Sequence, residues 1–234
     1  MRNIKLEIAY DGSDYHGFQR QKEERTVQGV LEEVLSKLCA EKITLAGSGR
    51  TDAGVHALTQ TVSFKTSGSI PTENIVRASA ALLPADMAVL SACETDGDFH
   101  ARFSAKWKCY GYRIICNERD NPFFVRYAWQ LRERPSAELM NRAASLLVGT
   151  HDFADFRSSG SVTGNSVRSI YHACWEDKSD ELYFRIAGDG FLYHMVRNIV
   201  WTLVQIGSGK YSIEEFAARL ELPQGSFSGA PAPA

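Results

Sequence analysis

The sequence contains no apolar run long enough to cross a membrane. A helical span needs ~20 consecutive apolar residues, and none of the 234 residues lies in such a stretch. The first ten residues, MRNIKLEIAY, alternate apolar and polar side chains, which predicts a strand rather than a signal peptide. The 44% hydrophobic and 23% charged residues are typical of an ordinary globular protein. These features predict a cytoplasmic protein with no membrane partner.

Closely spaced cysteine pairs are also missing. The five cysteines are dispersed, at positions 39, 93, 109, 116 and 174, and none belongs to a Cys-x-x-Cys pair. An odd number of scattered cysteines is typical of reduced cytosolic thiols and not of a disulfide framework. A metal site could be drawn from Cys109, Cys116, His172 and Cys174, but isolated thiols are the favoured interpretation. We therefore expect no metal.

The glycine-rich run GSGRTDAG lacks the features of nucleotide-binding loops. It does not end in the Gly-Lys-Ser/Thr of a P-loop. Gly49 and Gly54 are separated by four residues, whereas a dinucleotide fingerprint has two there. No Gly-x-Ser-x-Gly elbow occurs, which argues against a serine hydrolase.

An excess of positive charge is absent overall, because the formal net charge is −2. Residues 99–117, however, contain no acid, and basic and aromatic side chains alternate there: Arg102, Lys106, Lys108 and Arg113 with Phe99, Phe103, Trp107, Tyr110 and Tyr112. Positive charges follow phosphates and aromatic rings stack on unpaired bases, so this segment is a candidate RNA-binding element. Taken alone, it is better explained as a strand with one apolar face and one solvated face.

The order of predicted elements suggests two similar halves. Residues 1–104 predict strand, helix, two strands, helix and strand, at 4–8, 26–39, 42–48, 57–65, Pro71 to before Pro84, and 87–93. Residues 105–234 predict strands at 108–117 and 125–131, a helix at 135–148, a hairpin at 167–176 and 181–187, and helices at 193–206 and after Ser212. The sequence thus predicts an α+β protein of two tandem ferredoxin-like β-α-β-β-α-β halves, the second lacking its last strand.

Asp52 is the only acid between Glu41 and Glu73, and it lies in the glycine-rich loop. Arg50 could stabilise its ionised carboxylate and also bind a phosphate. An isolated aspartate can act as a nucleophile at carbon or serve as a turn residue, and without further context the turn is favoured. His56 lies near in sequence, where packing of the loop is favoured over a role as general base.

Five collinear motifs resemble the tRNA pseudouridine synthase A family. They are YDGSDYHGFQRQ (10–21), GRTDAGVHA (49–57), FHARFSA (99–105) followed by Tyr110, GTHDF (149–153) and GFLYHMVRN (190–198). The resemblance covers nearly the whole chain. It implies a cofactor-free homodimer that isomerises uridines 38–40 in the anticodon stem-loop of tRNA. It also implies that the two halves form one extended, mainly antiparallel sheet with helices on one face and an active-site cleft between the halves.

The resemblance assigns roles to several residues. Asp52 corresponds to the nucleophile, Tyr110 to the tyrosine that stacks on the target uracil, and Arg197 to the basic partner of the carboxylate, while Arg50 contacts substrate. Further candidates for RNA contact are Arg20, His56, Arg102, Lys106 and Lys108. The carboxylate could attack C1′, attack C6 of the base, or remove a ribose proton. The family pattern continues past Ala234 into a final strand, which we expect this chain to lack.

Two other functions remain open. The first is an RNA-binding protein of the same fold without catalysis. The second is a metal-assisted nuclease with Asp152 and Asp155 as ligands, although Asp152 follows a predicted helix end, where an Asx turn is common.

Overall fold

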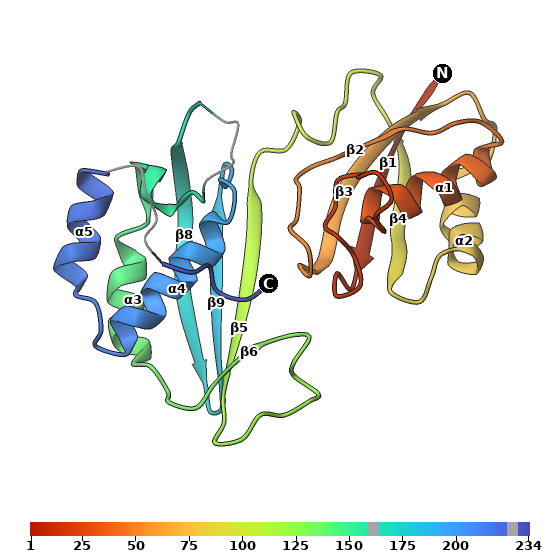
Figure 1. Ribbon diagram of the computed structural model, residues 1–234. Helices are drawn as coiled ribbons and strands as arrows, with labels where there is room; N and C mark the ends of the chain where they lie inside the picture. The colour runs from red at the N-terminus through yellow and green to blue at the C-terminus, as the bar shows by residue number, and fades with distance from the viewer. Residues whose placement is uncertain (159–163, 224–228) are drawn as a thin grey trace. The chain divides into compact units, whose positions relative to one another are not determined.

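The computed structural model describes residues 1–158, 164–223 and 229–234. The chain divides into two compact units, Met1–Ala105 and Lys106–Pro233. Each unit has its own strands and helices (Figure 1) and its own cluster of buried hydrophobic side chains. No helix in these described ranges is both long and apolar enough to span a membrane.

The first unit has the predicted β-α-β-β-α-β order. Its elements are β1 (Arg2–Tyr10), α1 (Val27–Cys39), β2 (Leu45–Gly47), β3 (Ala57–Thr66), α2 (Thr72–Leu82) and β4 (Met87–Thr95). The strands lie in the order β2-β3-β1-β4, and every pairing is antiparallel. This is the strand order of a ferredoxin-like unit, as the sequence predicted.

Alternation along β1 positions the core of this unit. Every second side chain from Ile4 to Tyr10 is buried, in one cluster with Leu31 and Leu35 of α1 and Ile75 of α2. Helix α1 begins after Thr26, whose hydroxyl accepts a hydrogen bond from the Gly29 N–H at 3.2 Å. Tyr10 is the last of the buried side chains of β1, and the chain enters the 11–26 loop directly after it.

The second unit carries a mainly antiparallel sheet in the order β6-β5-β9-β8-β7. Its elements are β5 (Lys108–Cys116), β6 (Trp129–Leu131), α3 (Ala137–Ser145), β7 (Gly149–Asp152), a 3₁₀ turn (Ala154–Phe156), β8 (Val167–Lys178), β9 (Glu181–Gly188), α4 (Met195–Gly207) and α5 (Ile213–Glu221). Among the described strands of this sheet, only β6 is parallel to its neighbour, β5. The helix expected after Ser212 is α5, which begins with a capping box formed by Ser212 and Glu215.

The α+β class and mainly antiparallel pairing are confirmed, with differences in detail. We expected one continuous sheet, but the described strands pair as two sheets, one in each unit. The strand expected at 125–131 is limited to Trp129–Leu131, because residues 122–127 form hydrogen-bonded turns. β7 was not expected. Part of the C-terminal run in which a last strand was sought, residues 224–228, lies outside the described residues.

Glu41 links the end of α1 to the end of β3 and makes stability depend on pH. Its carboxylate accepts hydrogen bonds from the Thr66 hydroxyl, from the Ser67 N–H and hydroxyl at 2.7 and 2.8 Å, and from the Gly68 N–H at 3.2 Å. These bonds, the Thr66 hydroxyl foremost, lower the pKa of Glu41 from 4.5 to about 2.

A depressed carboxylate pKa stabilises the native state above the unfolded value and loses that contribution as pH falls towards the folded value. We therefore expect Glu41→Gln to lose less stability than wild type between pH 4.5 and about 2. Urea unfolding of both proteins across this range measures the effect. Parallel stability curves would contradict it.

Candidate active site

Asp52 lies in the loop that joins β2 to β3. Its side chain is half-buried, and its carbonyl accepts a hydrogen bond from the Val55 N–H at 3.2 Å, which closes a turn over residues 52–55. Gly54 adopts φ 80° within this turn, a conformation that favours glycine. The sequence left both a turn and a nucleophile open for Asp52. The structure shows that Asp52 begins a turn through its carbonyl, a bond in which its carboxylate takes no part.

The 11–18 segment packs against this loop backbone to backbone. The Phe18 N–H donates to the Thr51 carbonyl at 3.0 Å, and the Gly54 N–H donates to the Tyr15 carbonyl at 3.4 Å. A Cβ on Gly12 would lie 2.0 Å from the Val55 carbonyl oxygen. A Cβ on Gly17 would likewise lie 2.9 Å from the Thr51 carbonyl oxygen. Such close approach explains why the first motif carries glycines where it meets the second.

His56 and Arg50 differ in their surroundings. The Nδ1 atom of His56 lies 3.1 Å from the Gly12 N–H nitrogen and 3.0 Å from a carboxylate oxygen of Asp11. These contacts place His56 between the 11–18 segment and the Asp52 loop. Arg50 is exposed, so its guanidinium is accessible to a phosphate.

Tyr110 and Arg197 both lie in the second unit. Tyr110 is on β5, and its ring meets Phe191 edge to face with 5.0 Å between centroids. Arg197 is in the first turn of α4, and its Nε donates to the Ala232 carbonyl at 2.7 Å. Burial raises the pKa of Tyr112, and the positive charge of Arg197 opposes that rise. The positive charge of Arg197 therefore acts on Tyr112, a residue of β5.

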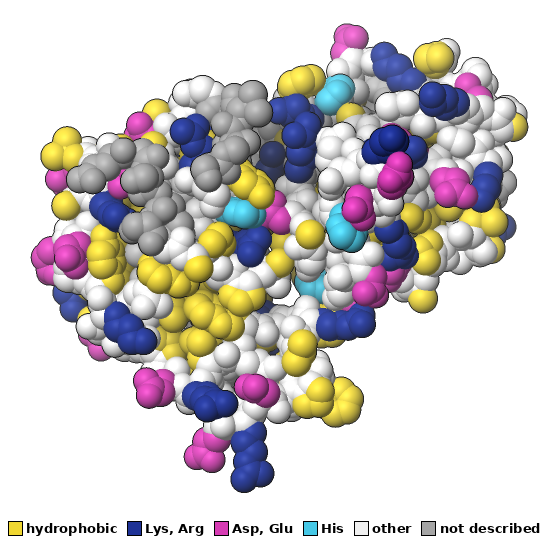
Figure 2. All heavy atoms as spheres, viewed as in Figure 1, with side chains coloured by type: hydrophobic (Ala, Val, Ile, Leu, Met, Phe, Trp, Pro, Cys, Tyr) yellow, Lys and Arg dark blue, Asp and Glu magenta, His cyan; other side chains and the backbone are white. Residues whose placement is uncertain are grey.

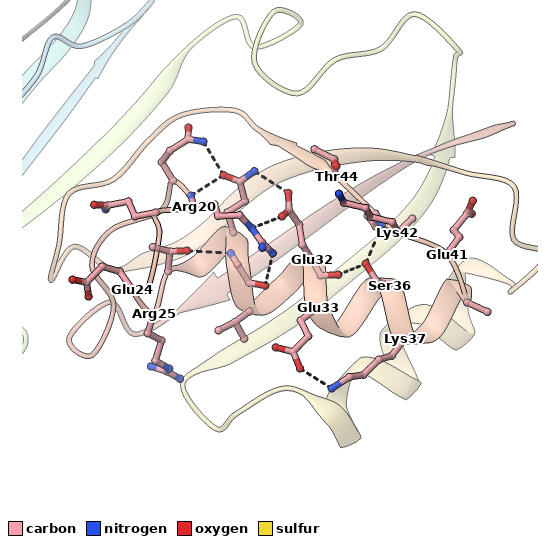
Figure 3. Close-up of a pocket in the computed structure, with 18 residues that line it drawn as sticks. Arg20, Glu24, Arg25, Glu32, Glu33, Ser36, Lys37, Glu41, Lys42 and Thr44 are labelled. Carbon is pink, nitrogen blue, oxygen red and sulfur yellow. Dashed lines mark hydrogen bonds and ion pairs between the residues drawn. The ribbon is translucent and has the colours of Figure 1, made fainter.

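Arg20 lies in an open groove along α1 (Figure 3). Its Nε is 2.8 Å from a carboxylate oxygen of the buried Glu32, and its guanidinium also reaches the Gly29 carbonyl at 3.3 Å. Four basic and four acidic residues line the groove: Arg20, Arg25, Lys37 and Lys42 with Glu24, Glu32, Glu33 and Glu41. Because the positive and negative charges are balanced, the groove is poorly suited to bind the phosphate backbone of a nucleic acid. Over the first unit, the face drawn in Figure 2 likewise intersperses basic and acidic side chains.

The basic and aromatic segment 99–108 is largely solvent-exposed. Phe103 is 77% and Trp107 62% exposed, and Arg102 and Lys106 are exposed as well, whereas Lys108 is half-buried on β5. The guanidinium of Arg102 lies 5.7 Å from the centre of the Phe103 ring. Large exposed aromatic rings beside cations are typical of surfaces that bind nucleic acid.

We expect Lys106→Ala to make tRNA binding less dependent on salt. Each phosphate contact that is lost reduces the slope of log K against log [salt] by roughly 0.7–0.9. Affinity measured by fluorescence titration over a series of salt concentrations gives this slope. Lys37→Ala is the matched control, because Lys37 already pairs with Glu33 at 2.7 Å. An unchanged slope for Lys106→Ala would count against the phosphate contact.

The two carboxylates of the nuclease alternative are engaged structurally. Asp152 accepts a hydrogen bond from the Ala154 N–H at 3.0 Å, so the predicted Asx turn is present. Asp155 is 1% exposed and lies 3.9 Å from the guanidinium of Arg219. Within the ranges that the structure describes, no group of three or more His, Cys, Asp or Glu side chains is placed to hold a metal ion.

Sequence reasoning missed two buried polar residues behind the Asp52 loop, Tyr10 and Gln60. They are 4% and 8% exposed, and their side chains bond to each other at 2.7 Å. Tyr10 is the last buried residue in the alternating pattern of β1, so the sequence suggests only that it packs in the core. The feature that marks Gln60, a polar side chain buried against a loop, is visible only in the structure.

Comparison of the sequence with models of protein families identifies the family of this chain. A family model described as tRNA pseudouridine synthase matches residues 7–104 and 143–234. The chain therefore belongs to the tRNA pseudouridine synthase family.

Curated relatives narrow the similarity further. A tRNA pseudouridine synthase A from Acetivibrio thermocellus is 43% identical over 100% of this chain and 96% of its own length. Proteins of the same name from Halalkalibacterium halodurans and Clostridium kluyveri are 45% and 40% identical over the whole chain, covering 89% and 96% of their own lengths. These matches extend over residues 105–142, which the family model leaves out.

Proposed function

We propose that this protein converts uridine to pseudouridine in the anticodon stem-loop of tRNA, with Asp52 as the nucleophile. Membership of the family makes it an isomerase of tRNA uridine. One observation of the site supports the role of Asp52. Its half-buried carboxylate lies on a loop whose backbone is fixed by turns and by the 11–18 segment.

The reaction needs positioning and charge but no change of oxidation state. The N1–C1′ bond breaks, the base turns and a C5–C1′ bond forms. The hydrogen of C5 leaves as a proton and N1 takes up a proton, so the product is an isomer of the substrate. A uridine in a stacked stem must first be flipped out, at a cost of a few kcal/mol. Stacking on the ring of Tyr110 would return about 1–3 kcal/mol. In this proposal Arg197 stabilises the ionised carboxylate of Asp52, and Arg50 binds the backbone of the flipped nucleotide.

Several finer assignments belong to the same proposal. The enzyme works in the cytoplasm, where its five cysteines stay free. It acts as a homodimer on tRNA without a cofactor. Arg102, Lys106 and Lys108 contact phosphates, supported by the exposed rings of Phe103 and Trp107 beside them.

Release of tritium from tRNA labelled at uracil C5 tests the proposed activity. C5 must lose its hydrogen when it bonds to C1′, so release reports the isomerisation. We expect release in the presence of a chelator and with no added cofactor. Tight tRNA binding without any release would favour the non-catalytic RNA-binding protein, and cleaved strands that disappear with the chelator would favour the nuclease.

A further inference from the structure

The hydroxyl of Tyr10 is the centre of a buried hydrogen-bond chain behind the Asp52 loop. It lies 2.8 Å from the Thr51 hydroxyl and 2.7 Å from the side-chain oxygen of Gln60. The side-chain nitrogen of Gln60 continues the chain to the Gly49 carbonyl at 2.8 Å. Tyr10 is the last residue of β1 and Gln60 lies on the neighbouring strand β3 (Figure 1), so two paired strands hold the chain in place.

The direction of every hydrogen bond in this chain follows from one fixed acceptor. The Gly49 carbonyl can only accept, so the amide nitrogen of Gln60 must face it and the amide oxygen must face Tyr10. The single proton of the Tyr10 hydroxyl is then donated to Gln60. The Thr51 hydroxyl consequently donates to the oxygen of Tyr10. A phenylalanine at position 10 could neither accept from Thr51 nor donate to Gln60.

The chain holds the catalytic loop at two points, on either side of Arg50. One point is the backbone carbonyl of Gly49, and the other is the side chain of Thr51, the residue immediately before Asp52. The backbone bond from Phe18 to Thr51 adds a third restraint at the same residue. A loop tied at Gly49 and Thr51 has little freedom to move the side chains of Arg50 and Asp52.

We propose that Tyr10 and Gln60 are positioning residues for the isomerisation. They act through Gly49 and Thr51 to hold the Asp52 carboxylate in its reactive position, and they do not touch the substrate. This inference rests on the proposed role of Asp52. Misplacement of a reacting group by about 1 Å can cost about a hundredfold in rate, so loss of the chain should reduce turnover and not binding.

The test compares Tyr10→Phe with Tyr15→Phe in the tritium-release assay. Both tyrosines are buried in the first unit and both lose a hydroxyl, but that of Tyr15 donates to Asp86 at 2.7 Å and is not part of the chain. Tyr15 meets the Asp52 loop through its backbone carbonyl, which accepts from the Gly54 N–H and is kept in Tyr15→Phe. We expect kcat of Tyr10→Phe to fall about ten- to a hundredfold with KM for tRNA within about twofold of wild type. We expect Tyr15→Phe to keep kcat within about threefold.

A second pair of variants separates positioning from a loss of folding. Thr51→Val removes the hydroxyl that donates to Tyr10, and it should reduce kcat to a similar extent as Tyr10→Phe. Thr51→Ser keeps the hydroxyl and should recover most of that loss. The double variant Tyr10→Phe/Thr51→Val should be no slower than the slower single variant, because both changes break the same bond.

Each contrary result has a distinct meaning. Equal loss of kcat in Tyr10→Phe and Tyr15→Phe, or multiplied losses in the double variant, would overturn the positioning role. So would a rise in KM with kcat unchanged. Full turnover in Asp52→Asn would overturn the role of Asp52 as nucleophile, on which this inference rests. An inactive Asp52→Asn with an unaffected Tyr10→Phe would overturn only the role of Tyr10.

Discussion

Replacing Asp52 with asparagine is expected to reduce pseudouridine formation by at least about a thousandfold, the scale seen when the nucleophile of an enzyme is removed. The amide has nearly the same shape as the carboxylate but carries no charge and is a far weaker nucleophile. The backbone turn at residues 52–55 uses the carbonyl of Asp52 and not its side chain, so it remains available in the variant. Tritium release under single-turnover conditions measures the chemical step directly.

Two further measurements make this result specific. The affinity of Asp52→Asn for tRNA should stay within a few-fold of wild type, because the exposed basic residues at 50, 102 and 106 are unchanged. Its thermal unfolding midpoint should also be close to that of wild type. Near-normal tritium release from the variant would remove Asp52 as nucleophile. Loss of release together with loss of tRNA binding would point to a folding or binding defect instead.

The fold of the first unit could be predicted because its elements carry strong local signals. Alternation in β1, helical spacing in α1 and the positions of Pro71 and Pro84 define strand, helix and helix boundaries without knowledge of tertiary contacts. In the second unit, local sequence signals do not predict those strands that form only because a neighbouring strand pairs with them. The helix predicted at 135–148 ends at Ser145, and Gly149 begins β7, whose four residues are a strand only because β8 pairs with them.

The candidate site was predictable in part. Asp52 stands out because it is an isolated acid among glycines, and the family motifs then give it a role. The support behind it depends on long-range contacts: Tyr10 meets Gln60 across 50 residues of sequence and Thr51 across 41. Neither pairing leaves a trace in composition or periodicity, because a tyrosine that ends a strand and a polar residue within one are each unremarkable alone. Three-dimensional register is what brings them together.

Gly12→Ala is expected to be the most disruptive small substitution near the site. A Cβ at this position would lie 2.0 Å from the carbonyl oxygen of Val55. The two atoms would clash, so the backbone of one of the two segments has to shift. The 11–18 segment and the 51–55 turn must therefore separate. We expect a loss of about 1–3 kcal/mol in the free energy of unfolding, as for other overpacked sites, and a fall in turnover because the turn that begins at Asp52 shifts.

Gly97→Ala provides the matched control, since an added Cβ there has no other atom within 4 Å and the residue is exposed. Its free energy of unfolding should be unchanged or higher by up to about 1 kcal/mol, because alanine restricts the unfolded chain. Urea unfolding and tritium release on both variants separate the two cases. Equal stability and equal turnover for the two alanine variants would mean that the loops tolerate separation. A stable but slow Gly12→Ala would instead show that the contact between the 11–18 segment and the Asp52 turn serves catalysis more than folding.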